Sequence, residues 1–285
     1  MTKVYAGIFI YADDLKLLAP SVHALRIMLN ICLNYASKFD VKFNDKSQLI
    51  VFKPHPDDVP CPVYINGAKL HAVESITHLG HVINEDIFKC DASKCIKDFN
   101  VQCNSFLADF KNANCFIRNH LFFKYCTSFY GAQFLPINND IVMHPLYVAW
   151  RMVVRRVWRV PWTTHCNLLP HIAGVMPPEL SLAKRSIKFI TKLIKSDNIT
   201  VKTITGMGLY SLHSFVGKNY RHLSAKYEMD TKNIIKAWDS ICQTQVDVIR
   251  ISEQIKELCV MRDSYQPFLL NKSQLRDLVN YTCTM

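Results

Sequence analysis

The fold of the first part of this chain is decided by residues 8–18, which have the sequence IFIYADDLKLL. Apolar, β-prone residues fill both halves of this stretch, and Ala12, Asp13 and Asp14 between them are typical of a turn. The pattern therefore predicts an antiparallel hairpin with two carboxylates at its tip. Adjacent acids repel each other unless they are well solvated or bind a hard cation such as Mg²⁺, so the tip is either a solvated turn or a metal site.

The residues that follow the hairpin predict a helix and further strands up to about residue 84. Ser21 is a suitable N-cap, and the helix after it places six apolar side chains on one face with the helical period: Val22, Leu25, Leu29, Cys32, Leu33 and Ala36. This face should cover one side of an antiparallel sheet. Strands are expected at residues 41–43, 48–52, 63–65, 68–70 and 76–83, and Asn66-Gly67 is a strong hairpin signal between two of them.

The chain changes character after about residue 91, where long segments with helical periodicity replace the short strands. With 285 residues, 49% of them hydrophobic, it is long enough for a large core, and only 8 glycines favour helices over a turn-rich β-sandwich. We therefore expect an α+β protein in three parts: residues 1–85, a helical region at 86–195 and a helical C-terminal extension at 196–285.

The charge of the chain favours an anionic partner. The formal net charge is +11, and residues 145–195 contain nine basic side chains against one acidic residue, Glu179. On a helix through residues 146–160, arginines recur every four residues beside an apolar stripe of Trp150, Val154 and Trp158. A second basic cluster follows at helical spacing, and nucleic acid is the partner that we expect first.

The candidate phosphate-binding residues are Arg151, Arg155, Arg156, Arg159, Lys184, Arg185, Lys188 and Lys192, with Lys195 beside them. The alternative interpretation is a solvated basic face over a packed core, and both can hold because long cationic side chains cover apolar surface with their stems.

Neither the apolar runs nor the cysteines indicate a membrane or a secreted protein. No apolar run reaches the ~20 residues of a membrane span, and the first residues lack the pattern of a signal peptide. The 11 cysteines are odd in number and their spacing fits no zinc template. We therefore expect buried thiols in a reducing compartment, the nucleus or the cytoplasm.

Several short segments occur in a characteristic order. The hairpin contains IYADDL at residues 10–15, and NDKS at 44–47 and HLGHVI at 78–83 follow it. Farther along come LF at 121–122, YCTSFYG at 125–131 and RVPWTTH at 159–165. In this order and spacing, residues 1 to about 195 resemble the late palm motifs and the following helical region of reverse transcriptases from LINE-type non-LTR retrotransposons.

The resemblance implies the C-terminal part of a polymerase palm at residues 1–85, with a sheet and a covering helix, and a thumb or connection region at 86–195. The activity would be RNA-directed DNA synthesis with Mg²⁺, on an RNA template and a DNA primer. In such enzymes the fingers and another metal carboxylate come earlier in the chain, so we expect a truncated enzyme that is inactive alone. The alternative is a co-opted, non-catalytic RNA- or DNA-binding protein.

The resemblance also assigns roles to the first motif. Asp13 corresponds to a metal carboxylate and Asp14 to its partner in the motif, while Tyr11 and Ala12 belong to the same motif. Because neighbouring side chains on a strand point in opposite directions, only one of the two acids should bind the metal directly.

Two later motifs receive roles in the same way. Lys46 falls where the family carries a lysine, which would protonate the departing pyrophosphate as a general acid; the alternative is a solvated turn lysine. Leu79 and Gly80 correspond to the hairpin that holds the primer end, or else they form an ordinary strand that ends at a glycine.

Overall fold

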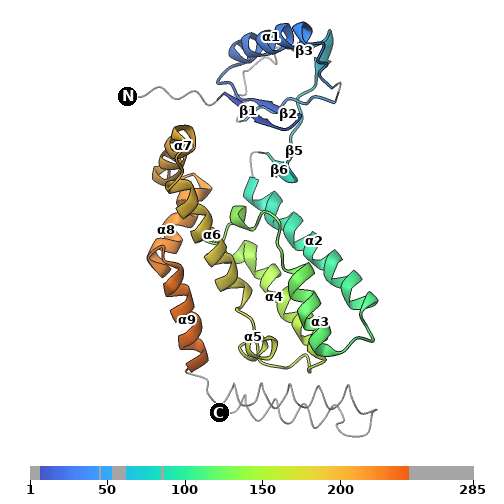
Figure 1. Cartoon of the computed structure of the whole chain (residues 1–285), viewed down its shortest axis with the longest axis vertical. Coiled ribbons are helices and arrows are strands. Elements are labelled where there is room, and N and C mark those ends of the chain that lie inside the picture. The colour runs from blue at the N-terminus through green and yellow to red at the C-terminus, as the bar shows by residue number, and fades with distance from the viewer. Residues whose placement is uncertain (1–6, 45, 53–61, 85–86, 244–285) are drawn as a thin grey trace. The chain divides into compact units, whose positions relative to one another are not determined.

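The computed structural model describes residues 7–44, 46–52, 62–84 and 87–243. The chain divides into two compact units, the first formed by residues 1–90 with 196–204 and the second by residues 91–195 with 205–285. Every strand among the described residues lies in the first unit, and the described part of the second unit is helical. The expected α+β class is therefore confirmed (Figure 1), while residues 244–285 of the expected C-terminal extension lie outside the described residues.

Three hairpins and one long helix make up the first unit. Each hairpin is a separate antiparallel pair. The elements are β1 (Ile8–Tyr11), β2 (Asp14–Leu17), α1 (Val22–Lys38), β3 (Val63–Ile65), β4 (Ala68–Leu70), β5 (Ile76–His78) and β6 (His81–Ile83). Asn66 and Gly67 form the turn between β3 and β4 with φ of 52° and 79°, as the sequence predicts.

The prediction of a single sheet is wrong for the described residues. Their strands form three separate two-stranded antiparallel ladders. Residues 41–43 are not a strand, because the Val41 N–H donates to the Ala36 carbonyl and closes the end of α1. Residues 48–52 contribute only one bridge, between Leu49 and Ala72. A β-strand needs a neighbouring strand whose backbone N–H and C=O groups pair with its own. The alternation of apolar residues in a sequence does not show whether such a neighbour is present.

Helix α1 has an apolar face on each side. The Ser21 hydroxyl accepts a hydrogen bond from the Ala24 N–H at 3.2 Å and caps the helix as predicted. The predicted inner face packs on β2 and β3 and is buried or half-buried along its length. A second stripe, which the sequence analysis missed, lies exposed on the outer side and consists of Ile27, Ile31, Tyr35 and Phe39.

The second unit is built from helices of very different lengths. They are α2 (Ile87–Asp109), α3 (Cys115–Leu121), the π-helical η1 (Phe122–Cys126), the 3₁₀-helical η2 (Ala132–Phe134), α4 (Asp140–Trp158), α5 (Leu168–Ala173), α6 (Pro178–Ile194), α8 (Phe215–Tyr227) and α9 (Thr231–Gln243). Helix α2 and the remaining helix, α7 (Ile199–Tyr210), both begin in residues assigned to the first unit.

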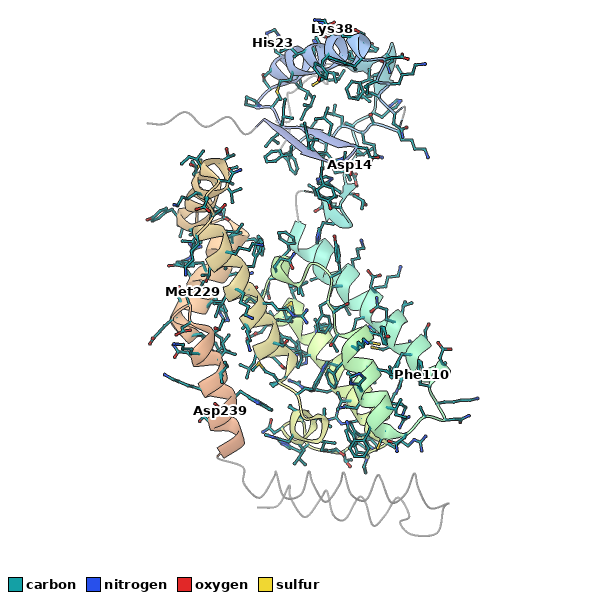
Figure 2. The ribbon with its side chains drawn as sticks, viewed as in Figure 1. Asp14, His23, Lys38, Phe110, Met229 and Asp239 are labelled. Atoms are coloured by element: carbon teal, nitrogen blue, oxygen red, sulfur yellow. The ribbon has the colours of Figure 1, made fainter. Side chains whose placement is uncertain are left out.

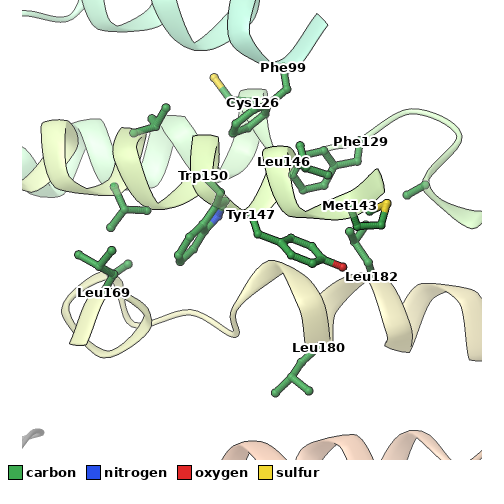
Figure 3. Packing of buried hydrophobic residues seen from close by; sticks show 14 of the residues in the cluster. Phe99, Cys126, Phe129, Met143, Leu146, Tyr147, Trp150, Leu169, Leu180 and Leu182 are labelled. Carbon is green, nitrogen blue, oxygen red and sulfur yellow. The ribbon is translucent and has the colours of Figure 1, made fainter. Parts of the chain in front are cut away.

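The core of the second unit is centred on α4. Trp150, Val154 and Trp158, the predicted apolar stripe, are exposed by no more than 2%. Figure 3 shows side chains from α4, such as Trp150 and Tyr147, filling the space between this helix and α6, which carries Leu182. Helix α4 begins at Asp140, six residues before the expected start, because Asn139 caps it and Pro145 is tolerated in its second turn.

Two amide side chains, the half-buried Asn119 and the buried Asn219, join the elements around α4. Asn119 of α3 accepts a hydrogen bond from the Trp158 indole at 2.9 Å and donates to the Ala173 carbonyl of α5 at 3.0 Å. Asn219 of α8 donates to the Leu135 carbonyl at 2.9 Å. Each bond satisfies polar groups that would otherwise be costly to bury, so these contacts fix how the helices meet.

The cysteines of this core behave as packing groups. Cys103, Cys115 and Cys126 are buried, as expected from the sequence. A hydrogen bond with Cys126, followed by burial, raises the pKa of the Cys103 thiol above its usual range. This thiol is therefore protonated and inert at neutral pH.

We expect Trp150→Ala to lower the free energy of unfolding of the helical unit by about 3–5 kcal/mol, because it removes a large side chain from a closed core. Urea denaturation followed by circular dichroism measures the change. Trp162→Ala is the matched control, since Trp162 is 84% exposed and its loss should change stability by less than about 0.5 kcal/mol. Equal effects of the two substitutions would contradict this description of the core.

Candidate functional site

The two acids of the first motif lie at different points of the β1–β2 hairpin. Tyr11 and Asp14 form the last pair of the ladder, so the turn consists of Ala12 and Asp13 alone and not of the three residues expected. Ala12 has φ of 52°, a left-handed conformation that favours glycine and costs an alanine about 1–2 kcal/mol. The Asp13 carboxylate is exposed at the tip, where a ligand can reach it.

Asp14 points toward a second hairpin. One of its carboxylate oxygens lies 3.6 Å from Nδ1 of His78, the last residue of β5. This nitrogen is buried and makes no hydrogen bond, while the Asp14 side chain is half exposed. The two groups form an ion pair only when the histidine is protonated. His78 was not among the predicted site residues, although it directly precedes Leu79 in the quoted motif.

Leu79 and Gly80 form the tight turn that joins β5 to β6. Their φ angles are 48° and 80°, and His78 pairs with His81 on either side of them. Residues 76–83 are therefore a hairpin and not the single strand that the period indicates. The left-handed leucine is a strained position, and such positions occur most often at functional turns.

Lys46 is exposed on a turn built by Asn44. The Asn44 side-chain oxygen accepts the Lys46 N–H at 2.9 Å, and the Asn44 carbonyl accepts the Ser47 hydroxyl at 2.7 Å. This arrangement is an Asx-turn, in which the asparagine stands in for a backbone turn. It fixes the backbone of Lys46 and leaves the long side chain in solvent, as both interpretations of this lysine require.

The exposed Asp13 and the neighbouring Asp14 fit part of a magnesium site. Proteins hold Mg²⁺ through one or two carboxylates, and water and phosphate oxygens complete the shell. Across the described residues, no cluster of three or more His, Cys, Asp or Glu side chains is suited to hold a metal. Asp13 and Asp14 would therefore supply only part of a coordination shell.

Three arginines of α4 and its C-cap, Arg151, Arg155 and Arg159, are bound to protein acceptors. Arg151 pairs with Glu179 at 2.6 Å, and Arg155 donates to the Thr164 carbonyl at 2.8 Å. Arg159 ends α4 in a left-handed conformation and donates to the Lys111 carbonyl. These three arginines, which the sequence analysis predicted as phosphate contacts, thus bind α6 and the adjoining loops.

Arg185 of α6 is used in the same way. It donates to the carbonyls of Ser128 and Thr127, and its guanidinium lies 5.9 Å from the centre of the Phe129 ring. Burial lowers the pKa of Arg185. The two carbonyls and the ring replace the water that this cation loses.

The other basic residues of this segment are more open to solvent. Arg156, Lys188, Lys192 and Lys195 are exposed, and Lys184 is half-buried. The last three turns of α6 border a groove of about 340 Å³ opposite the corner between α8 and α9, where Met229 lies (Figure 2). The residues lining this lysine groove are Ile187, Lys188, Thr191, Lys192, Lys195, Met229, Asp230 and Thr231.

No family model, curated protein or solved structure matches this chain. Among the helices in the described part of the chain, none is both long and apolar enough to span a membrane.

Arg155 and Arg156 provide a matched pair for the role of the arginines. Arg155→Gln should lower the free energy of unfolding by about 1–2 kcal/mol, because the buried Thr164 carbonyl loses its guanidinium donor. Arg156→Gln removes the same charge from an exposed neighbour and should change stability by less than about 0.5 kcal/mol. Urea denaturation of the two variants measures the difference, and equal stabilities would show that the Arg155 bonds contribute nothing.

Proposed function

We propose that this chain is a part of a reverse transcriptase of the LINE-type non-LTR class, comprising the end of the palm and the helical region that follows it. The observation that carries the proposal is the contact between two motifs far apart in sequence, Asp14 of the first hairpin and His78 at the base of the Leu79-Gly80 hairpin. By the resemblance, one hairpin supplies a metal carboxylate and the other holds the primer end. Nucleotidyl transfer needs these two functions side by side.

In this proposal, Asp13, Asp14 and Lys46 have different roles. Asp13, exposed at the tip, would be the direct ligand of Mg²⁺, which when bound lowers the pKa of a hydroxyl nucleophile and neutralises phosphate charge. Asp14, turned toward His78, would position the second hairpin against the first. Lys46 remains the proposed general acid, because its turn fixes the backbone and leaves the ammonium group free to reach a phosphate.

The exposure of β1 supports the proposal that further palm elements cover this strand in the complete enzyme. All four residues of β1 are exposed, Ile10 by 71%, and in the described structure β1 pairs with β2 alone. An isolated two-stranded hairpin is only marginally stable in water. We therefore propose that additional strands from outside this chain pair with β1 and supply the remaining metal carboxylate, and that the chain is inactive without them.

The expected result for the isolated chain is no extension of a DNA primer on an RNA template with either Mg²⁺ or Mn²⁺, because a single carboxylate pair holds two metal ions poorly. A gel-based primer extension assay measures the product. Measurable extension that disappears in Asp13→Asn, and survives in the control Asp40→Asn on the same unit, would overturn the claim of inactivity.

The proposed assignment to a reverse transcriptase is tested on the protein as the cell makes it. An antibody to the C-terminal region and the 5′ end of the transcript give its true length. A product much larger than 32.9 kDa should extend primers, and Asp13→Asn within it should abolish extension while Asp40→Asn leaves it unchanged. A larger product that extends primers equally well with Asp13→Asn would refute the assignment of the first motif.

The lysine groove favours a second candidate, a non-catalytic RNA- or DNA-binding protein. Its three lysines, Lys188, Lys192 and Lys195, lie along α6 at helical spacing and line one groove with a single acid, Asp230. Such a row can follow a phosphate backbone. Because four arginines of the segment are bound to protein acceptors, we propose these lysines, with Arg156, as the phosphate contacts in either candidate function.

We expect the binding of single-stranded RNA to weaken as salt increases, with a slope that depends on these lysines. Replacing all three groove lysines by glutamine should reduce the slope of log affinity against log salt by about 2, since each phosphate contact on a single strand contributes ~0.7. Fluorescence anisotropy over a salt series measures the slope. The control is Lys218→Gln, Lys226→Gln and Lys236→Gln, which removes the same charge from exposed positions of α8 and α9.

An unchanged slope in the groove variant, or an equal reduction in the control, would exclude the groove as the phosphate site. No binding by the unaltered chain would contradict the second candidate altogether.

A further inference from the structure

The loop between α4 and α5 contains a tight turn with a tryptophan near its apex. The Thr164 N–H donates to the Pro161 carbonyl at 3.0 Å, and the Thr164 hydroxyl donates to the same oxygen at 2.7 Å. Trp162 and Thr163 are the two central residues. Proline fixes its own backbone angle before the turn, so the position of Trp162 is set by covalent geometry as well as by hydrogen bonds.

Both ends of this turn are anchored to α4. Before it, the Val160 N–H donates to the Arg155 carbonyl and the Val160 side chain is buried. After it, Thr164 is only 1% exposed, and its carbonyl accepts two bonds from the Arg155 guanidinium. The backbone on both sides of Trp162 is thus held to α4, and in this arrangement the indole lies in solvent.

Trp162 differs from the other tryptophans of the chain. Trp150 and Trp158 are buried, and Trp238 is half-buried against the His171 ring at 5.3 Å. Trp162 is 84% exposed. An indole held in water on a rigid turn loses the burial that makes the residue favourable elsewhere in the fold, and such exposed anchors are typical of binding surfaces.

We propose that Trp162 is a stacking platform for an unpaired base of single-stranded nucleic acid. The charge of the surrounding sequence favours this ligand over an apolar protein surface: residues 145–195 contain nine basic side chains, and their one acid, Glu179, is bound to Arg151. Base stacking needs only an accessible ring face, and cationic side chains bind the phosphates of the same strand. The inference rests on the nucleic-acid binding proposed above and adds a site outside the lysine groove.

The test uses the full chain, a short oligo(dT), a blunt DNA duplex and three forms of the protein: unaltered, Trp162→Ala and Trp162→Phe. Oligo(dT) should quench the tryptophan fluorescence of the unaltered chain, and this quenching should be absent in Trp162→Ala. The alanine variant should bind oligo(dT) about tenfold or more weakly, because one base–aromatic stack contributes roughly that factor. The phenylalanine variant keeps a ring and should retain most of the affinity.

Two further measurements, the salt slope and the affinity for a duplex, distinguish base stacking from phosphate binding. The salt slope of Trp162→Ala should equal that of the unaltered chain, since no phosphate contact is lost, whereas the groove variant reduces it. Affinity for the duplex should not change, because its bases are already stacked. Urea denaturation confirms that each variant is folded, and Trp162→Phe supplies the comparison should the alanine variant be unstable.

The outcomes distinguish failure of this inference from failure of the proposed function. Binding of oligo(dT) by the unaltered chain with the groove-dependent slope, but without quenching and with equal affinity for Trp162→Ala, overturns the stacking platform alone. No binding of oligo(dT) by the unaltered chain overturns the stacking platform together with the proposed binding of nucleic acid.

Discussion

The burial of one face of α4 is the constraint on which the second unit depends. Trp150, Val154 and Trp158 are buried together, and burying an indole N–H without an acceptor costs free energy. Asn119 is that acceptor for Trp158, and its amide group binds α5 at the same time. The amide group of one half-buried side chain, Asn119, thus connects α3 to both α4 and α5.

The same packing decides what the basic residues can do. The arginines next to the buried stripe face loop carbonyls that have lost water, and the planar guanidinium with its several N–H donors satisfies them well. Lysine ammonium groups are compact and strongly hydrated, and those on the second half of α6 stay in solvent beside a groove. One region of uniform positive charge is thus divided between structural arginines and exposed lysines.

In the first unit, apolar side chains of two regular elements are exposed along most of the element's length. Helix α1 exposes a stripe opposite its buried face, and β1 is exposed along its length. Ala12 and Leu79 hold left-handed conformations in the two motif turns. Asp14 of the first of these hairpins lies 3.6 Å from His78 of the second, so the two strained turns belong to neighbouring hairpins.

The sequence by itself determined the β1–β2 and Asn66-Gly67 hairpins, the capped helix α1, the helical second unit and the buried stripe of α4, because each depends on local period, turn chemistry or capping. It did not determine strand pairing at 41–43 and 48–52, the contact of Asp14 with His78, or the acceptors of Arg151 and Arg155. Those depend on which distant backbone and carboxylate groups come close in space. A period shows that a side chain lies on a given face, and only the tertiary structure shows what that face meets.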